Sequence, residues 1–143
     1  VNVVRIFQSY ERTKDTDTVL ERKGQGLQTS IEDRVKELQK LRGELELMNE
    51  EVREPKMREV EEKSDALDRL RQQSQRDFQR ERSRVVSELV DEIQGVVTEY
   101  AKANGFSLIL DQQALLYSQG VPDITEEILK LLNTKYAAQK GRR

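Results

Sequence analysis

The chain has 143 residues, of which 36% are charged and 35% hydrophobic, and its formal net charge is −2. One domain is expected at this length, but apolar residues are too scarce for a compact core of ordinary size. The absence of Cys and His excludes thiol nucleophiles, Cys or His metal sites and imidazole acid–base chemistry. We therefore expect a protein that is not an enzyme and that uses no metal or cofactor.

Acidic and basic residues alternate through most of the chain, which is typical of a solvated helical surface. Six arginines lie between Arg69 and Arg84, but Asp68, Asp77 and Glu81 are interspersed with them. Glycine and interleaved aromatic residues, which nucleic-acid-binding segments commonly carry, are missing from this stretch apart from Phe78. We expect no nucleic-acid partner.

A first long helix is predicted from about Ile6 to Arg53. Its apolar residues recur at alternating spacings of four and three with one polar interruption, which is the pattern of a coiled-coil seam. The seam positions are Leu27, Ile31, Arg34, Leu38, Leu41, Leu45, Met48 and Val52.

Pro55 is expected to end this helix, because the residue before a proline is biased away from helical dihedrals and proline fits the first turn of a new helix. A second helix is predicted from about Lys56 to Ala103. Two helices of similar length around a short break indicate an antiparallel hairpin, with its tip near residues 54–56. Pairing positions outward from this break would place Ile31 near Phe78.

The same pairing places Arg34 near Ser74, and Leu38 near Arg71. Two interpretations of this polar layer stay open: it fixes the register of the helices, or it forms a flexible waist. Gly24 and Gly26 add a second soft region, because each glycine costs a helix about 1 kcal/mol relative to alanine. The candidate hinge residues are therefore Gly24, Gly26, Arg34, Arg71 and Ser74.

Asn104 and Gly105 predict the end of the second helix, since both tolerate a left-handed backbone. Strands are predicted at 106–111 and 114–118, with a further edge strand at 1–4. Asp123 and Glu126 have the spacing of a capping box before a last helix. The apolar side of that helix is expected to carry Ile124, Ile128, Leu131, Leu132 and Tyr136.

Apolar density divides the chain. Only 4 of the 24 residues in 61–84 are apolar, against 25 of the 52 residues in 85–136. The expected fold is mainly α with a small β body: a base from about 1–10 and 96–138, a helical hairpin from about 11–95, and a tail at 139–143. Three short strands make a meagre sheet, so several copies are expected to share this base. Its assigned residues are Phe106, Leu108, Leu110, Leu115, Tyr117, Ile124 and Ile128.

The order of these features carries a family resemblance. The segment Leu108-Ile109-Leu110-Asp111, followed by Leu116-Tyr117 and Asp123-Ile124-Thr125, resembles the C-terminal signature of the Skp/OmpH family of periplasmic chaperones. The start Val1-Asn2-Val3-Val4-Arg5-Ile6-Phe7, with Tyr10, is similar to the family's strand-to-helix start. A long charged hairpin stands between these two ends.

This resemblance implies a homotrimer in the periplasm, shaped like a jellyfish, whose helical tentacles surround a cavity. It implies a holding chaperone that binds unfolded outer-membrane β-barrel proteins without ATP. The slightly acidic chain departs from the strongly basic familiar member, so charge gives no reason to expect contact with lipopolysaccharide or a membrane. A structural coiled-coil scaffold without chaperone activity is the alternative.

A holding chaperone needs many shallow and reversible contacts, which long arms can provide. Apolar residues outside the seam, and the two methionines near the hairpin tip, are the candidates for such contacts. They are Val35, Leu47, Met48, Met57 and Leu70.

Overall fold

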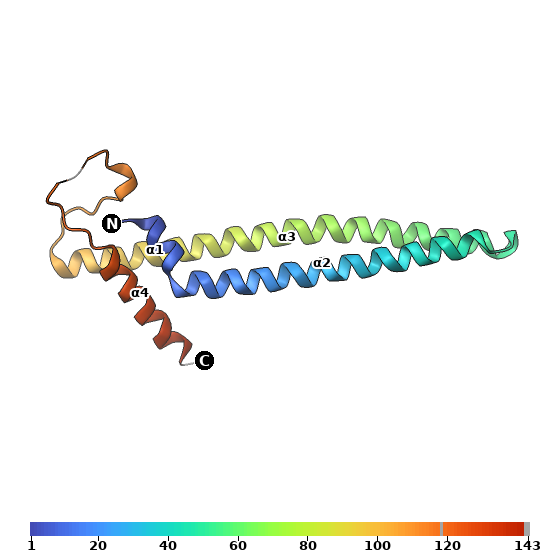
Figure 1. Cartoon of the computed structure of the whole chain (residues 1–143), viewed down its shortest axis with the longest axis horizontal. Helices are drawn as coiled ribbons and strands as arrows, with labels where there is room; N and C mark the ends of the chain where they lie inside the picture. The colour runs from blue at the N-terminus through green and yellow to red at the C-terminus, as the bar shows by residue number, and fades with distance from the viewer. Residues whose placement is uncertain (118, 142–143) are drawn as a thin grey trace. The chain divides into compact units, whose positions relative to one another are not determined.

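The computed structural model describes residues 1–117 and 119–141. Their helices are α1 (Val3–Ser9), α2 (Glu11–Glu46), α3 (Glu50–Asn104) and α4 (Thr125–Lys140), with a short 3-10 helix at Gln112–Ala114 (Figure 1). The mainly helical prediction is confirmed. The chain divides into two compact units: a terminal unit, Val1–Val19 with Ser83–Arg143, and a hairpin unit, Leu20–Arg82.

The hairpin unit pairs α2 with α3, as the seam pattern predicts. Half-buried Ile31, Val35, Leu41 and Met48 pack against its buried residues. The side chain of Lys63 in α3 reaches Glu37 in α2 at 2.5 Å. The long helical hairpin is thus confirmed, with a narrow apolar seam between charged faces. The buried seam residues are Leu38, Leu45, Val60 and Leu67.

The chain reverses direction at residues 47–49, between α2 and α3. Within this turn, the N–H groups of Leu47 and Met48 donate to the carbonyls of Glu44 and Leu45, three residues earlier, which tightens the end of α2. The carbonyl of Asn49 accepts hydrogen bonds from the N–H groups of Val52 and Arg53, so α3 begins directly after Asn49.

The predicted helix break and tip at Pro55 are therefore wrong. Pro55 lies inside α3, in its second turn. A proline at this depth removes the hydrogen bond to the carbonyl of Glu51 and crowds that carbonyl, yet α3 is continuous through it. Asn49 is a residue type that favours helix starts. The earlier turn also shifts the register. Phe78 faces Gly24 rather than Ile31: a Cβ built on Gly24 would lie 3.6 Å from the Phe78 ring.

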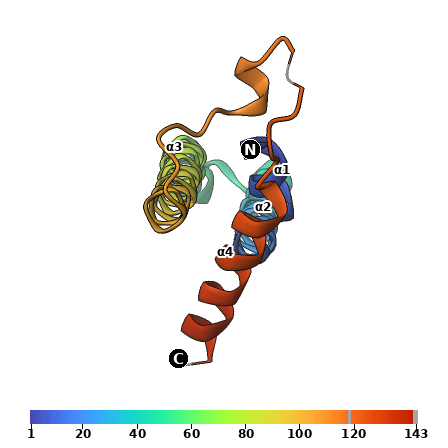
Figure 2. The same cartoon turned by 90° about the vertical axis from the view of Figure 1, so that its left-hand side faces the viewer.

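The terminal unit has a core built from three helices. Figure 2 shows α1 against the start of α4. The partly buried Val85, Val97, Tyr100 and Tyr136 pack around this core. Its buried residues come from α1 and its end (Ile6, Tyr10), from α3 (Leu89, Ile93, Val96) and from α4 and its start (Ile124, Ile128, Leu132).

Tyr10 separates α1 from α2, so the single helix predicted from Ile6 to Arg53 is wrong at this point as well. Its backbone is extended (φ −66°, ψ 126°), and its ring is fully buried, edge-on to Tyr136 with centroids 6.0 Å apart. The N–H of Glu11, which the break leaves free, donates to Oδ1 of Asn133 in α4 at 3.0 Å. Contacts with α4 therefore stabilise this break.

The strand predictions are also wrong: residues 1–117 and 119–141 contain no strand. In the predicted edge strand at 1–4, Val3 and Val4 belong instead to α1, and 106–111 has no regular structure. In the segment 114–118, Ala114 ends the 3-10 helix, and Ser118 lies outside the described residues. Strands need a paired neighbour. Among the described residues, only Val1 supplies backbone pairing to the segment 106–112. Its N-terminal ammonium donates to the carbonyl of Leu110, and its carbonyl accepts from the N–H of Gln112.

The end of α3 follows the prediction. Gly105 adopts φ 69°, and the N–H of Phe106 donates to the carbonyl of Ala101. The capping box of α4 does not form: Ile124 rather than Asp123 is the N-cap residue, and Glu126 pairs with Arg5.

The apolar side of α4 is largely as predicted, but Leu131 is exposed. The predicted tail at 139–143 is partly helical, since α4 continues to Lys140, and Arg142 and Arg143 lie outside the described residues. The division of the chain into a base and a tentacle stays a prediction.

Candidate functional site

In the described part of the chain, no group of three or more acidic side chains is placed to hold a metal ion. No helix there is long and apolar enough to cross a membrane. The features with functional potential are instead surfaces: an exposed apolar segment in the terminal unit and exposed apolar side chains in the hairpin unit.

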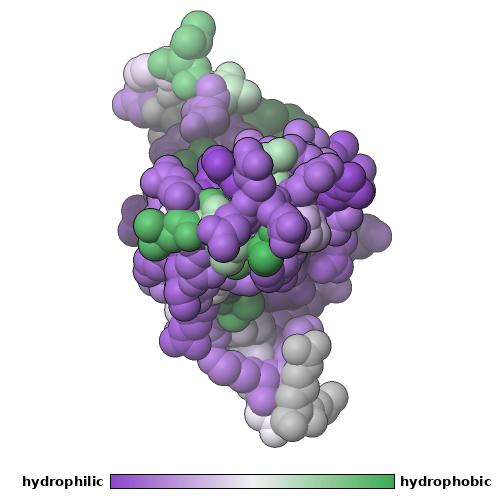
Figure 3. Space-filling model, turned by 90° about the vertical axis from the view of Figure 1, so that its right-hand side faces the viewer, coloured by the Kyte–Doolittle hydropathy of each residue, from purple (hydrophilic) through white to green (hydrophobic). Residues whose placement is uncertain are grey.

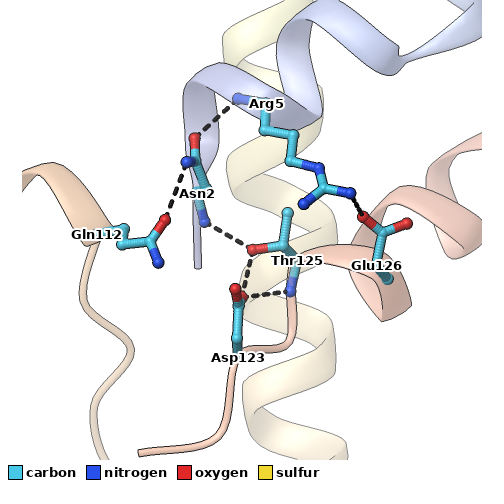
Figure 4. A network of polar contacts seen from close by, with 6 residues as sticks. All are labelled: Asn2, Arg5, Gln112, Asp123, Thr125 and Glu126. Atoms are coloured by element: carbon cyan, nitrogen blue, oxygen red, sulfur yellow. Dashed lines mark hydrogen bonds and ion pairs between the residues drawn. The ribbon is translucent and has the colours of Figure 1, made fainter. Parts of the chain in front are cut away.

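A polar junction in the terminal unit centres on Thr125, whose side chain is almost fully buried (Figure 4). Its Oγ1 accepts a hydrogen bond from the backbone N–H of Asn2 at 2.8 Å and donates one to Asp123. Asp123 Oδ1 also accepts from the N–H of Thr125 at 3.0 Å. These two hydrogen bonds hold the pKa of Asp123 below its usual range, and the one from the hydroxyl of Thr125 has the larger effect.

Asn2 links the same junction to two other segments (Figure 4). Its Oδ1 accepts from the N–H of Arg5 at 2.8 Å and so caps α1. Its Nδ2 donates to Oε1 of Gln112 at 2.9 Å. The guanidinium of Arg5 pairs with Glu126 at 2.6 Å. The junction therefore ties the N-terminal segment, the 3-10 helix and the start of α4 together.

A second set of polar contacts ties α4 to α2. Oδ2 of Asp15 accepts from Oη of Tyr136 at 2.9 Å and from Nζ of Lys140 at 2.7 Å. These two hydrogen bonds lower the pKa of Asp15, and the one from Lys140 has the larger effect. Nearby, Arg12 of α2 reaches Glu92 of α3 at 2.5 Å.

The connection between α3 and α4 exposes most of the apolar residues assigned to a shared base. Leu108 is 70% exposed, Tyr117 is 78% exposed, and Leu110 is also exposed. Phe106 lies at the surface, stacked on Tyr100 with ring centroids 6.1 Å apart. Only Ile124 and Ile128 of the assigned set are buried within the chain, and Leu115 is half-buried.

Leu116 and Val121 were missed by the sequence-based assignment, although both are large, apolar and exposed. In a predicted strand, Leu115 and Tyr117 share one face and Leu116 takes the other. The run of apolar residues at 114–117 was the signal that could have included Leu116.

The predicted contact residues of the hairpin unit fall into two groups. Leu47 is 89% exposed and Met57 is 46% exposed. Val35 and Met48 are half-buried against the seam, and Leu70 is also half-buried. Only the first two offer a large free apolar surface.

The predicted hinge residues do not meet in one layer. Gly24, Arg71 and Ser74 line an open groove of about 460 Å³ with Leu27, Ile31 and Phe78. Arg34 lies elsewhere, with Lys63 and Ala66. Gly26 has open space where a Cβ would lie, and α2 is continuous through both glycines.

The fold and these surfaces define a class: a long helical-hairpin protein whose prominent features are exposed apolar side chains rather than a cleft of converging reactive groups. The family model OmpH, described as outer membrane protein (OmpH-like), matches residues 1–132. The chain therefore belongs to the OmpH-like family, which confirms the resemblance noted from the sequence.

Individual relatives agree with this assignment. The chaperone protein Skp of Yersinia enterocolitica is 25% identical over 134 residues, covering 91% of this chain and 82% of that protein. A crystal structure of an OmpH-like protein from Caulobacter crescentus CB15, described as a candidate outer membrane chaperone, matches with a TM-score of 0.84 at 18% identity. It covers 94% of this chain and 82% of the other, and at this identity it shows a shared fold.

Proposed function

We propose that this protein is an ATP-independent holding chaperone of the periplasm, which binds unfolded outer-membrane β-barrel proteins and prevents their aggregation. Membership of the OmpH-like family and the similarity to a protein named chaperone Skp support the proposal. The observation that carries it is the free apolar surface at the turn of the hairpin unit and on the helix that follows, above all at Leu47 and Met57. Such side chains bind unfolded chains weakly and reversibly, as a holding function requires.

The assembly proposed is a homotrimer with a shared base. The exposed Leu108, Leu110, Leu116 and Tyr117 lie in one connecting segment, and such a concentration of apolar surface is typical of an interface. Phe106 and Leu115 extend this surface, while Ile124 and Ile128 belong to the core that supports it.

Client contact is proposed for Leu47 and Met57, with smaller contributions from Val35, Met48 and Leu70, whose burial leaves less surface free. Replacing Leu47 and Met57 together with Ser is expected to reduce aggregation suppression while leaving the helical content unchanged. If a folded double variant suppressed aggregation as well as the parent, these two residues would not be the contact points.

A bending region is proposed where the seam is loosest, at the groove lined by Gly24, Arg71 and Ser74. Gly26 adds backbone freedom next to it. Arg34 lies outside this groove, beside Lys63, and is the weakest of the hinge candidates.

The test is dilution of a urea-unfolded β-barrel membrane protein into this protein, with the mass measured by light scattering. A species of about 50 kDa, three copies of the 16.7 kDa chain, plus one client and without aggregate is the expected result. A client that aggregates beside an unchanged oligomer would favour the alternative, a structural coiled-coil scaffold.

A further inference from the structure

The turn of the hairpin unit concentrates negative charge. Residues 44–54 contain five glutamates and one arginine, a net charge of −4, while the whole chain carries −2. The rest of the chain is therefore slightly positive. Within the described part of the chain, Glu46, Glu50 and Glu51 make no ion pair, whereas Glu44 pairs with Lys40 and Glu54 with Arg58.

Helix electrostatics explain only part of this charge. Glu50 and Glu51 lie in the first turn of α3, where the helix dipole favours carboxylates. Glu44 and Glu46 lie in the last turn of α2, where the dipole disfavours them, and this turn has no basic residue. The negative charge at the end of α2 therefore opposes the local stability of the fold.

Apolar side chains are exposed around the same turn. Leu47 is 89% exposed, Val52 is 54% exposed and Met57 is 46% exposed. The seam pattern had placed Val52 inside, but the turn at 47–49 leaves it outside. Figure 3, which faces the end of the hairpin unit where α2 and α3 meet, shows separate apolar patches among hydrophilic side chains.

We propose that this turn surface, formed by Glu46, Leu47, Glu50, Glu51 and Val52, binds a short polypeptide segment that combines large apolar side chains with Lys or Arg. The apolar residues of the segment would cover Leu47 and Val52. Its cations would compensate the unpaired carboxylates, and such charge complementarity selects a partner more than it adds affinity. An anionic segment would be repelled by the same carboxylates.

This inference rests on the proposed function in one respect: the cationic segment is taken to be part of an unfolded client. It adds a preference among segments of that client. Stretches with basic residues beside apolar ones are held at the turn, and acidic stretches are not.

The test uses two short fluorescein-labelled peptides, one alternating Leu with Lys and the other alternating Leu with Glu. Binding to the full chain is measured by fluorescence anisotropy at low ionic strength. The parent protein is expected to bind the Lys peptide and to bind the Glu peptide at least about tenfold more weakly. The Lys peptide gains several exposed charge pairs with the carboxylates of the turn, whereas the Glu peptide is repelled by them.

Two variants separate the contributions of charge and apolar surface. Glu46→Gln, Glu50→Gln and Glu51→Gln together are expected to weaken binding of the Lys peptide about tenfold and to reduce its salt dependence. Leu47→Ser with Val52→Ser is expected to weaken it while leaving the salt dependence in place. Circular dichroism checks that each variant stays helical.

Matched controls carry the same changes away from the turn. Glu21→Gln, Glu32→Gln and Asp65→Asn remove three carboxylates from elsewhere in the hairpin unit, and Val19→Ser with Val86→Ser removes two other exposed valines. Each control is expected to change binding by less than about twofold. Equal losses in the controls and the turn variants, or equal binding of both peptides, would overturn the inference.

Aggregation suppression by the parent protein is measured in parallel, because it tests the proposed function independently. A parent that binds the Lys peptide at the turn but lets an unfolded β-barrel protein aggregate would contradict the chaperone proposal and retain the peptide site. A parent that suppresses aggregation but does not distinguish the peptides would retain the chaperone proposal and exclude the charge preference.

Discussion

The terminal unit and the hairpin unit are held together differently. In the terminal unit, buried side chains of α1, α3 and α4 meet in one core, and Thr125 links the N-terminal segment to the start of α4 through partly buried hydrogen bonds. In the hairpin unit, a narrow seam of four buried residues is flanked by solvent-exposed ion pairs such as Lys63–Glu37. The terminal unit is therefore stabilised by a core shared among three helices, whereas the hairpin unit depends on a narrow contact between two helices.

The largest effect is expected from truncating the core of the terminal unit. Ile128 is fully buried, and Ile128→Ala should lower the free energy of unfolding by about 3–4 kcal/mol, because it removes apolar contacts and leaves a cavity. Urea unfolding followed by circular dichroism measures the loss. Leu131→Ala, at an exposed position of the same helix, is the control and should cost little.

Leu67→Ala, in the seam of the hairpin unit, should lower the free energy of unfolding by less than Ile128→Ala does. A larger loss would contradict the difference between the two units. Leu67 is buried between only two helices, so its surroundings can relax further after truncation.

A smaller loss is expected from Thr125→Val, which keeps the shape of the side chain but removes its hydroxyl. The N–H of Asn2 and the carboxylate of Asp123 then lose a hydrogen-bond partner, at a cost of about 1–3 kcal/mol. Urea unfolding measures this as well. Thr134→Val removes an exposed hydroxyl from α4 and should change stability far less; an equal loss in both variants would show that the junction adds nothing.

The two units should also differ in how salt changes the pKa values of their carboxylates. Asp123 has a lowered pKa in the folded protein, so its contribution to stability is complete above its unfolded pKa of about 4 and is lost as the pH falls through the folded value. Glu37 behaves in the same direction because Lys63 donates to it.

The causes of these two shifts differ, and NMR titration of the carboxyl groups can separate them. The ion pair of Glu37 is exposed, so about 1 M salt should move its pKa toward the usual value. Asp123 accepts from the buried Thr125, and its pKa should stay low in salt. Equal salt responses would contradict the distinction drawn between the units.

The smallest effect is expected in the hairpin unit at Gly26. Gly26→Ala should raise the free energy of unfolding by about 0.5–1 kcal/mol, because alanine favours the helix and nothing lies within 4 Å of the new Cβ. Thermal unfolding measures the gain. In Gly24→Ala the Cβ would meet Phe78 at an ordinary contact distance, so a similar gain is expected; a loss in both variants would mean that α2 needs glycine here.

Local sequence patterns predicted the hairpin because helix periodicity depends on residues three and four apart. Leu38 and Leu45 lie in the seam as the spacing indicated. The end of α3 at Gly105 and the buried side of α4 follow from equally local signals. The family resemblance, carried by the segments near both ends of the chain, is confirmed.

Predictions that needed distant partners failed. A strand at 106–111 requires a neighbouring strand, and among residues 1–117 and 119–141 only Val1 pairs with the end of that segment. The turn lies at 47–49 rather than at Pro55. The seam spacing predicts a helix that continues through Val52, but Asn49 starts α3 before that residue. Val35 was expected outside the seam but packs partly against it.

The sequence by itself determined the long helices, their pairing and the family, because each depends on the spacing of residues along one helix or on ordered local motifs. Only the tertiary structure decided the break at Tyr10, the polar junction at Thr125 and the exposure of Val52 and Leu108. Each of these depends on residues far apart in the chain or on the position of a turn. The free energy of burying a side chain or pairing a polar group is set by its neighbours in space, which local spacing does not specify.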